Sequence, residues 1–208
     1  MARAPRPGAS RPGLEPLLGP DGCARLQRAL IARAGRWAAR VGVPWVAYGP
    51  ADARAEIGAL APEGARPIAQ EGPHPGARLE HAFATVHAEH GGPVIVIGTD
   101  QPTLGAAHAR AVLDDLADDV DVCLGPATAG GYYLLAARRP DPALFGIDPS
   151  AWGGPEVMNL TLASLVAAGL SMGWLRSERF LEQPADAAAL LADPCAPADV
   201  VAALRPRG

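Results

Sequence analysis

The sequence predicts an α/β protein with a three-layer α/β/α architecture around a doubly wound, mostly parallel sheet. Segments with strand and helix patterns alternate along the chain, which is typical of this class. One of them, Val94–Ile97, is an uninterrupted β-branched run, as expected of a central parallel strand covered on both faces. Aromatic residues make up only 5% of the chain, while alanine and small aliphatic residues are abundant. This composition favours helix–sheet layers over a β-sandwich.

Length and composition limit how the chain can be organised. Its 208 residues are enough for one domain with a substantial core, and we expect that domain to span residues 1–193. The segment 194–208 is expected to be a tail that either adds a short helix or stays mobile. Every basic residue is an arginine, which excludes Schiff-base chemistry, a lysine general base and Walker-type phosphate lysines.

Charge and cysteine usage argue against several partners. The net charge of −4 and the absence of a basic run give no support for nucleic-acid binding. No signal peptide or membrane-spanning apolar run is present, so no membrane contact is expected. Three widely spaced cysteines without a CxxC pair predict reduced thiols and a cytoplasmic location. A Rossmann GxGxxG and a GxSxG elbow are also absent.

In the first half of the chain, strands and helices are expected to alternate after an irregular N-terminal segment. Met1–Pro20 holds five prolines and is not expected to form a regular element. Apolar residues then recur at helical spacing from Asp21 to about Arg40. The next expected elements are a strand at Val43–Tyr48, a short helix at Ala51–Leu60, a weak strand at Arg66–Gln70 and a helix at Pro75–His90.

An acidic residue follows the apolar strand Val94–Ile97. Gly98 ends the strand, and Asp100 lies in a short loop closed by Pro102. Ligands of open α/β sheets bind just beyond the carboxyl ends of the strands. Asp100 is therefore a candidate to hold a divalent metal or a substrate hydroxyl. The alternative is an aspartate that caps a helix or stabilises a turn, which is common after any strand.

In the second half of the chain, helices and strands are expected to go on alternating. The helix at Pro155–Ala168 begins with a proline suited to the first helical position, and we expect Val157, Leu160, Thr161 and Leu165 to face inward. The other expected elements are a helix at Gly105–Leu116, strands at Val120–Leu124, Tyr132–Ala137 and Ser171–Leu175, and a helix at Ala185–Leu191.

A pair of glycines lies between two of these strands. Gly130 and Gly131 permit backbone conformations closed to other residues and allow a ligand to approach the main chain. Tyr132 and Tyr133 point to opposite faces of the following strand, so only one can line a pocket. The alternative is a plain glycine-rich turn with one packed and one surface tyrosine.

An ordered set of motifs resembles a bacterial family of small glycosyltransferase-like proteins with the GT-A fold, some of them assigned to arsenosugar biosynthesis. Its relatives include nucleotidyltransferases of the molybdenum-cofactor and F420 pathways. The resemblance spans about Arg3 to Asp186. The matching segments are APRPG near the N-terminus, QEGPHPGARL, GTDQPTL, DVCLGPATAGGYYL and the tryptophan before PEVMNLT.

The resemblance implies transfer from a nucleotide-activated small-molecule donor to an acceptor of unidentified chemistry, with Mg²⁺ or Mn²⁺ bridging the donor phosphates. Asp100 matches the family's metal-binding aspartate and is the implied catalytic residue. Glu182 is the remaining candidate for a second metal carboxylate. The implied nucleotide- and phosphate-binding residues are Arg3, Arg6, Gly8, Gly76 and Arg78. The implied acceptor side consists of Gly130, Gly131, Tyr132 and Trp152, although Trp152 can equally close the core.

Several positions depart from the family pattern. The loop's K-T-R-L reads Arg11-Pro12-Gly13-Leu14, which we expect to weaken phosphate binding because basic groups and a hydroxyl are lost. His74 and Ala129 replace family aspartates, and the first strand is expected to be truncated at the N-terminus. Two functions follow: a metal-dependent transferase, glycosyl rather than nucleotidyl, or a catalytically degenerate GT-A-like domain that binds a nucleotide or a protein.

Overall fold

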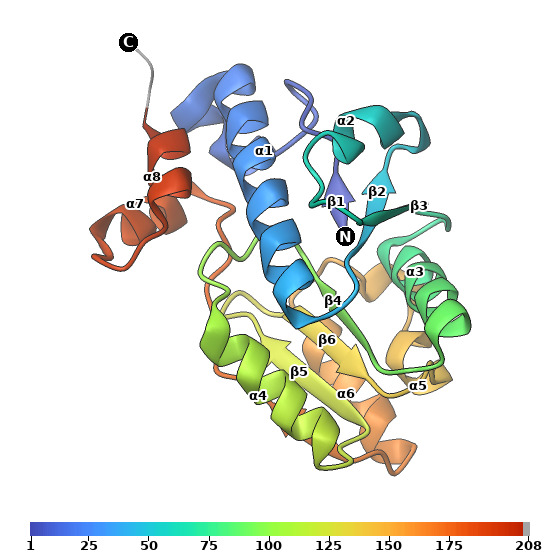
Figure 1. Cartoon of the computed structure of the whole chain (residues 1–208). Coiled ribbons are helices and arrows are strands. Elements are labelled where there is room, and N and C mark those ends of the chain that lie inside the picture. The colour runs from blue at the N-terminus through green and yellow to red at the C-terminus, as the bar shows by residue number, and fades with distance from the viewer. Residues whose placement is uncertain (206–208) are drawn as a thin grey trace. The chain divides into compact units, whose positions relative to one another are not determined.

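The computed structural model describes residues 1–205, and Figure 1 shows an α/β fold. The chain divides into two compact units. The first consists of residues 1–69, 98–104 and the described part of the chain from Phe180 on, and the second of residues 70–97 and 105–179. The expected single domain over residues 1–193 stays a prediction.

The first unit contains a parallel three-stranded sheet in the order β1–β2–β3. Its elements are β1 (Ala2–Arg3), the 3-10 helix η1 (Pro12–Leu14), α1 (Glu15–Val41), β2 (Trp45–Gly49), η2 (Ala51–Ala53), α2 (Arg54–Gly58), β3 (Arg66–Ala69), α7 (Pro184–Ala192) and α8 (Ala198–Leu204).

Helix α1 contributes to two apolar clusters of the first unit. Ile31 packs among buried residues of β1, β2 and α2. Leu26 and Leu30 belong to a second cluster with apolar residues of α7 and α8. Figure 1 shows α1 with the strands on one side and α7 and α8 on the other. Burial on both sides explains why this helix is the longest element among residues 1–205.

The second unit contains a mixed four-stranded sheet in the order β4–β6–β5–β7. Strand β6 is antiparallel to β4 and β5, and β7 is parallel to β5. The elements are α3 (Pro75–His90), β4 (Val94–Ile97), α4 (Ala106–Ala117), β5 (Val122–Pro126), β6 (Tyr132–Ala137), α5 (Pro142–Phe145), η3 (Pro149–Ala151), α6 (Val157–Ala167) and β7 (Met172–Trp174).

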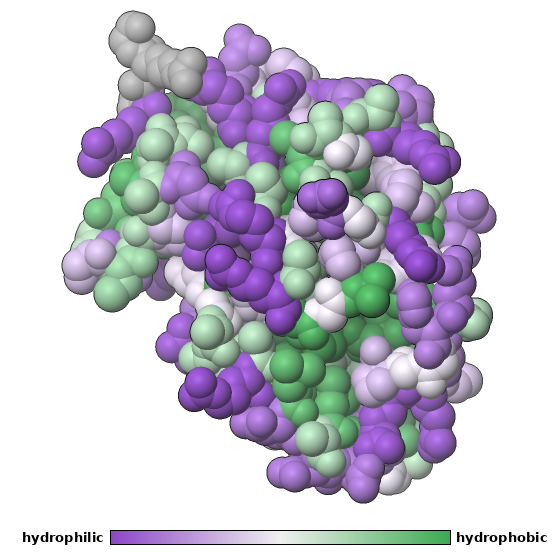
Figure 2. Space-filling model, viewed as in Figure 1, coloured by the Kyte–Doolittle hydropathy of each residue, from purple (hydrophilic) through white to green (hydrophobic). Residues whose placement is uncertain are grey.

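The structure corrects three expectations. Met1–Pro20 is not irregular, since it contains β1, η1 and the start of α1, which kinks at Gly19 before Pro20. The strand Val94–Ile97 is not a central parallel strand: within its sheet it pairs with β6 alone, antiparallel, and its two middle residues are only partly buried. Figure 2 shows an apolar area over the strands of the second unit.

Leu160 was expected to face inward but faces outward, with 39% of its surface exposed.

The structure at the two ends of the chain refines the expectations for the first strand and for the C-terminal segment. The first strand is present but holds only two residues, both paired with β2. The segment after Asp193 adds the short helix α8, whose Val200 and Leu204 are buried. Among the described residues, no helix is long and apolar enough to cross a membrane.

Candidate functional site

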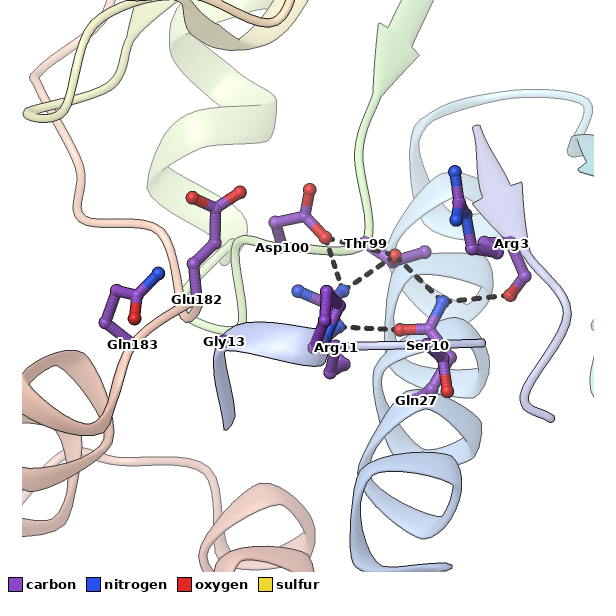
Figure 3. A pocket seen from close by; sticks show the side chains of 10 residues that line it. Arg3, Ser10, Arg11, Gly13, Gln27, Thr99, Asp100, Glu182 and Gln183 are labelled. Atoms are coloured by element: carbon purple, nitrogen blue, oxygen red, sulfur yellow. Dashed lines mark hydrogen bonds and ion pairs between the residues drawn. The ribbon is translucent and has the colours of Figure 1, made fainter. Parts of the chain in front are cut away.

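A polar cavity of about 390 Å³ lies in the first unit. Figure 3 shows that its side chains come from the end of β1, the loop before η1, helix α1, the loop 98–104 and the segment that precedes α7. The lining residues are Arg3, Ser10, Arg11, Pro12, Gly13, Gln27, Thr99, Asp100, Glu182 and Gln183. Arg3, Asp100 and Glu182, which are predicted site residues far apart in the sequence, therefore line one cavity.

Main-chain contacts bring Glu182 to the loop that carries Asp100. The N–H of Leu181 donates to the carbonyl oxygen of Asp100 over 2.8 Å. Asp186 then accepts hydrogen bonds from the backbone N–H groups of Glu182 and Gln183 at the start of α7. A Cβ at Gly13 would collide with the backbone carbonyl oxygen of Glu182. This close approach requires glycine, so the departure from K-T-R-L at this position has a structural cause.

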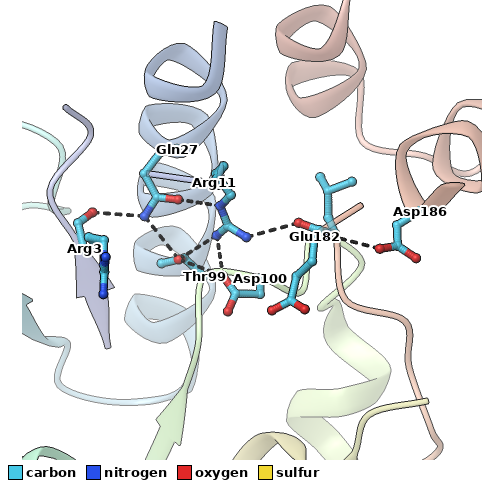
Figure 4. A network of polar contacts seen from close by, with 8 residues as sticks. Arg3, Arg11, Gln27, Thr99, Asp100, Glu182 and Asp186 are labelled. Atoms are coloured by element: carbon cyan, nitrogen blue, oxygen red, sulfur yellow. Dashed lines mark hydrogen bonds and ion pairs between the residues drawn. The ribbon is translucent and has the colours of Figure 1, made fainter. Parts of the chain in front are cut away.

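Arg11 is the buried cation of the cavity, with only 6% of its side chain exposed. Figure 4 shows its guanidinium at the centre of a polar network. It forms an ion pair with Asp100 and donates to Gln27 Oε1 over 2.7 Å. It also donates to the Thr99 hydroxyl over 3.0 Å and to the carbonyl oxygen of Leu181 over 3.1 Å. Position 11 of the loop therefore supplies a cation to the cavity, and the expected weakening of phosphate binding stays a prediction.

The backbone of Arg11 adopts a left-handed conformation, with φ 57° and ψ 49°. This conformation is unfavourable for a residue with a Cβ and persists when surrounding contacts hold it. The Arg11 carbonyl accepts from the N–H of Leu14 and from the thiol of Cys23. Main-chain and side-chain contacts together fix the guanidinium in the cavity.

Gln27 and Thr99 complete the network around Arg11. The Gln27 amide nitrogen donates to the carbonyl oxygen of Arg3 over 3.0 Å and lies 3.4 Å from the Thr99 hydroxyl. Both side chains are almost fully buried. Sequence reasoning missed Arg11, Gln27 and Thr99 as site residues. Thr99 adjoins the predicted aspartate and was a recognisable signal, whereas Gln27 lies within an otherwise ordinary helix.

The two carboxylate oxygens of Asp100 differ in their hydrogen-bond and ion-pair contacts. Oδ1 accepts from Arg11 and from the Thr99 hydroxyl. Among the described residues, no hydrogen bond or ion pair reaches Oδ2. The side chain is 37% exposed, and Figure 3 shows it pointing to the same side as Glu182. Asp100 is neither a helix cap nor a turn-stabilising residue, so that alternative is wrong.

Glu182 has an electrostatically perturbed carboxyl group. Partial desolvation raises its pKa, and the negative charge of Asp100 raises it further, while Arg11 opposes the shift. Two acidic groups and two arginines therefore face one cavity. Their oxygens suit Mg²⁺ or Mn²⁺, which often bind through one or two carboxylates plus waters and substrate phosphates. No cluster of three or more metal-ligating side chains occurs among the residues described.

The three predicted residues of the N-terminal loop have different surroundings. Arg3 lines the cavity, and its guanidinium has no ion-pair partner within residues 1–205. Arg6 does not line it: ion pairs with Asp52 (3.2 Å) and Glu56 (2.6 Å) hold its side chain and raise its pKa. Gly8 has a φ of 70°, and a Cβ there would meet open space. A phosphate contact by Arg6 stays a prediction that requires these ion pairs to break.

Gly76, Arg78 and Trp152 belong to the second unit. A Cβ at Gly76 would collide with the indole of Trp152, so the glycine is explained by side-chain packing. The indole nitrogen is buried, and no hydrogen-bond partner for it lies within residues 1–205. Arg78 donates to the carbonyl oxygen of Gly72 over 3.3 Å. These contacts favour packing roles, and the expected nucleotide contacts stay predictions.

The glycine pair forms the turn between β5 and β6 in the second unit. Both residues have positive φ angles, 92° at Gly130 and 70° at Gly131. A Cβ at Gly130 would lie 2.7 Å from the backbone of Pro155, whereas one at Gly131 would meet open space. Tyr133 is buried and Tyr132 is partly buried, as the opposite faces of β6 require. Desolvation raises the pKa of the buried Tyr132 hydroxyl, and a contact with the Thr161 side chain opposes the shift. Their acceptor-side assignment stays a prediction.

Two solved structures are similar to this chain over most of their length. A proposed nucleotide-diphospho-sugar transferase from Desulfovibrio desulfuricans G20 has a similar structure, with a TM-score of 0.85 and 25% sequence identity over 98% of this chain and 94% of that one. CMP:2-keto-3-deoxy-manno-octonic acid synthetase, solved with CTP, has a TM-score of 0.59 and 17% identity over 92% and 94%. No protein of curated function matches.

The family assignment rests on a separate match. Residues 24–153, more than half of the chain, match the family described as "uncharacterized protein conserved in bacteria". That segment includes the loop with Asp100 and the glycine pair between β5 and β6. The chain therefore belongs to the DUF2064 family.

Proposed function

We propose that this protein is a metal-dependent transferase that uses a nucleotide-activated donor, and that it transfers a glycosyl rather than a nucleotidyl group. The observation that carries the proposal is the cavity of the first unit, in which the carboxylates of Asp100 and Glu182 lie beside the guanidinium groups of Arg3 and Arg11. Acidic groups suit a divalent cation and arginines suit phosphate oxygens.

The similar structures support the same class of ligand. One is the proposed nucleotide-diphospho-sugar transferase and the other is the synthetase solved with CTP. The higher TM-score belongs to the former, which favours glycosyl transfer. The cavity is suited to bind a nucleoside diphosphate group, because the anionic phosphate oxygens can bind the same divalent cation as the protein carboxylates.

Each side chain of the cavity would then have a defined task. Asp100 would present Oδ2 to the metal, and Glu182 would be its second protein ligand. Arg3 would bind a phosphate oxygen, because its guanidinium is not held in another ion pair by the described residues. Bound Mg²⁺ or Mn²⁺ would stabilise the charge that develops on the diphosphate leaving group. Gln27 and Thr99 would hold Arg11 in place.

A second candidate function is a nucleotide-binding domain without catalysis. The observation that favours it is the ion pair between Arg11 and Asp100, which already occupies one oxygen of the proposed metal ligand. Such a domain would bind a nucleotide through its arginines and show no dependence on a divalent cation.

Ligand-induced thermal stabilisation separates the two candidates. Wild type and Asp100→Asn are heated with a panel of nucleotides and nucleotide sugars, each with and without Mn²⁺. The matched control is Asp199→Asn, which breaks the ion pair between Asp199 and Arg36 (2.6 Å) outside the cavity. The transferase predicts a Mn²⁺-dependent shift in wild type and in the control but not in Asp100→Asn. Stabilisation that is independent of both Mn²⁺ and Asp100 favours the binding domain, and no stabilisation by any nucleotide contradicts both.

A further inference from the structure

The ion pair between Arg11 and Asp100 has a consequence for cation binding. An arginine cannot give up its proton in a protein, and a buried cation needs a compensating anion. Arg11 is almost fully buried, and Asp100 is its ion-pair partner among the described residues. Its other partners, Gln27, Thr99 and the Leu181 carbonyl, are neutral. The charge of Arg11 is therefore balanced directly by Asp100 and, without a direct ion pair, by Glu182 in the same cavity.

The carboxylate of Asp100 is also the proposed metal ligand. Because Arg11 contacts Oδ1, a divalent cation on this carboxylate would lie close to a fixed positive charge (Figure 4). The two positive charges would repel each other across a site that is partly shielded from water. Oδ2 stays available, but with Oδ1 paired the carboxylate can offer one oxygen rather than two.

We propose that Arg11 is an internal counter-cation that lowers the affinity of Asp100 for divalent metal in the free protein. This inference rests on the proposed metal site at Asp100. Arg11 is thus a positioning residue: it keeps the cavity charge-balanced without a metal and sets how tightly a metal binds. Donor phosphates that arrive with the cation would supply Arg11 with a replacement anion and so weaken its hold on Asp100.

Substitution of Arg11 is therefore expected to strengthen metal binding rather than to weaken it. Removing the positive charge at position 11 should tighten metal binding, whereas damage to a merely structural residue would loosen it. Two neutral variants are suitable. Arg11→Gln keeps hydrogen-bonding groups, and Arg11→Gly relieves the left-handed backbone conformation. Arg11→Lys keeps the charge and is the conservative control.

The experiment measures binding of Mn²⁺ alone by electron paramagnetic resonance, with the full-length variants checked for folding by circular dichroism. We expect Arg11→Gln and Arg11→Gly to bind Mn²⁺ roughly tenfold tighter than wild type or more, and Arg11→Lys to stay within about threefold of wild type. Adding Asp100→Asn to either neutral variant should abolish the gain. Arg36→Gln, which breaks a surface pair with Asp199, should change nothing.

Equal or weaker Mn²⁺ binding by a folded neutral variant would overturn the proposal. Loss of the fold in both neutral variants would also overturn it, because the proposal treats the ion pair as an exchangeable contact. The measurement uses neither nucleotide nor turnover, so it is independent of the transferase. Tighter Mn²⁺ binding together with an absence of nucleotide binding by wild type would support Arg11's role and contradict the proposed function.

Discussion

Substitution of Gln27 by methionine tests the polar network that holds the cavity together. Methionine has nearly the length and volume of glutamine, so packing within α1 is preserved while both polar groups are removed. The buried guanidinium of Arg11 loses a charge-assisted hydrogen bond of 2.7 Å, and the Arg3 carbonyl loses a donor at 3.0 Å. A charge-assisted bond is worth about 1.5–3 kcal/mol and a neutral one about 1 kcal/mol.

The expected loss in the free energy of unfolding is therefore about 3 kcal/mol, or a decrease in Tm of roughly 6–12 °C for a chain of this size. Urea unfolding followed by circular dichroism measures it. In an Arg11→Gly background the same substitution should cost about 1.5–3 kcal/mol less, because the charged partner is already gone. A loss below about 1 kcal/mol in the wild-type background, or equal losses in both backgrounds, would refute the reasoning.

Three further predictions concern Gly76, the cysteines and Glu182. Gly76→Ala should destabilise the protein by about 1–3 kcal/mol in urea unfolding because its Cβ meets the indole of Trp152, and the cost should shrink in a Trp152→Leu background. Native protein should react with one equivalent of Ellman's reagent, at exposed Cys195, and unfolded protein with three; rapid labelling of the other two cysteines in the native state would contradict their burial. Because its pKa is raised, Glu182 takes up a proton at higher pH in the folded than in the unfolded chain. As pH falls, Mn²⁺ affinity should therefore begin to decrease above the ordinary glutamate pKa of about 4.3. Folded-state stability should gain from the same protonation, and Glu182→Gln should remove this part of the pH dependence.

Local patterns predicted most of the regular elements. The bounds of α3, β4 and β6 agree with the expected segments, because apolar spacing, Pro75 at the start of α3 and β-branched runs are local signals. Strand pairing is not local. The apolar run of β4 indicated burial but carried no information on which strand pairs with it, so its antiparallel pairing with β6 was missed.

The N-terminal segment shows why short elements escape a local pattern. Strand β1 holds two residues, and its pairing with β2 depends on residues about 46 positions away. Proline-rich composition predicted no regular element over Met1–Pro20, which is wrong, because β1, η1 and the start of α1 lie there. It could not reveal that η1 and the kinked start of α1 position Arg11 and Gly13 beside the cavity.

The candidate site was predicted in part for the same reason. Asp100 was predicted from its place after a strand and Glu182 from the family resemblance, and the structure brings both to one cavity. Arg11 was missed because its role depends on partners 88 and 170 residues away, Thr99 and Leu181. Gly130 was expected to admit a ligand, yet the space beside it is taken by the backbone of Pro155.

The central claim is that Asp100 presents a carboxylate oxygen to a divalent cation in the cavity of the first unit. Anomalous scattering from crystals grown with Mn²⁺ and a nucleotide that stabilises the protein tests it most directly. We expect one anomalous peak at coordination distance from Asp100, about 2.0–2.2 Å from a carboxylate oxygen, with Glu182 turned toward the same ion. Density with the nucleotide bound, the Arg11–Asp100 ion pair intact and no anomalous peak beside Asp100 would contradict the account.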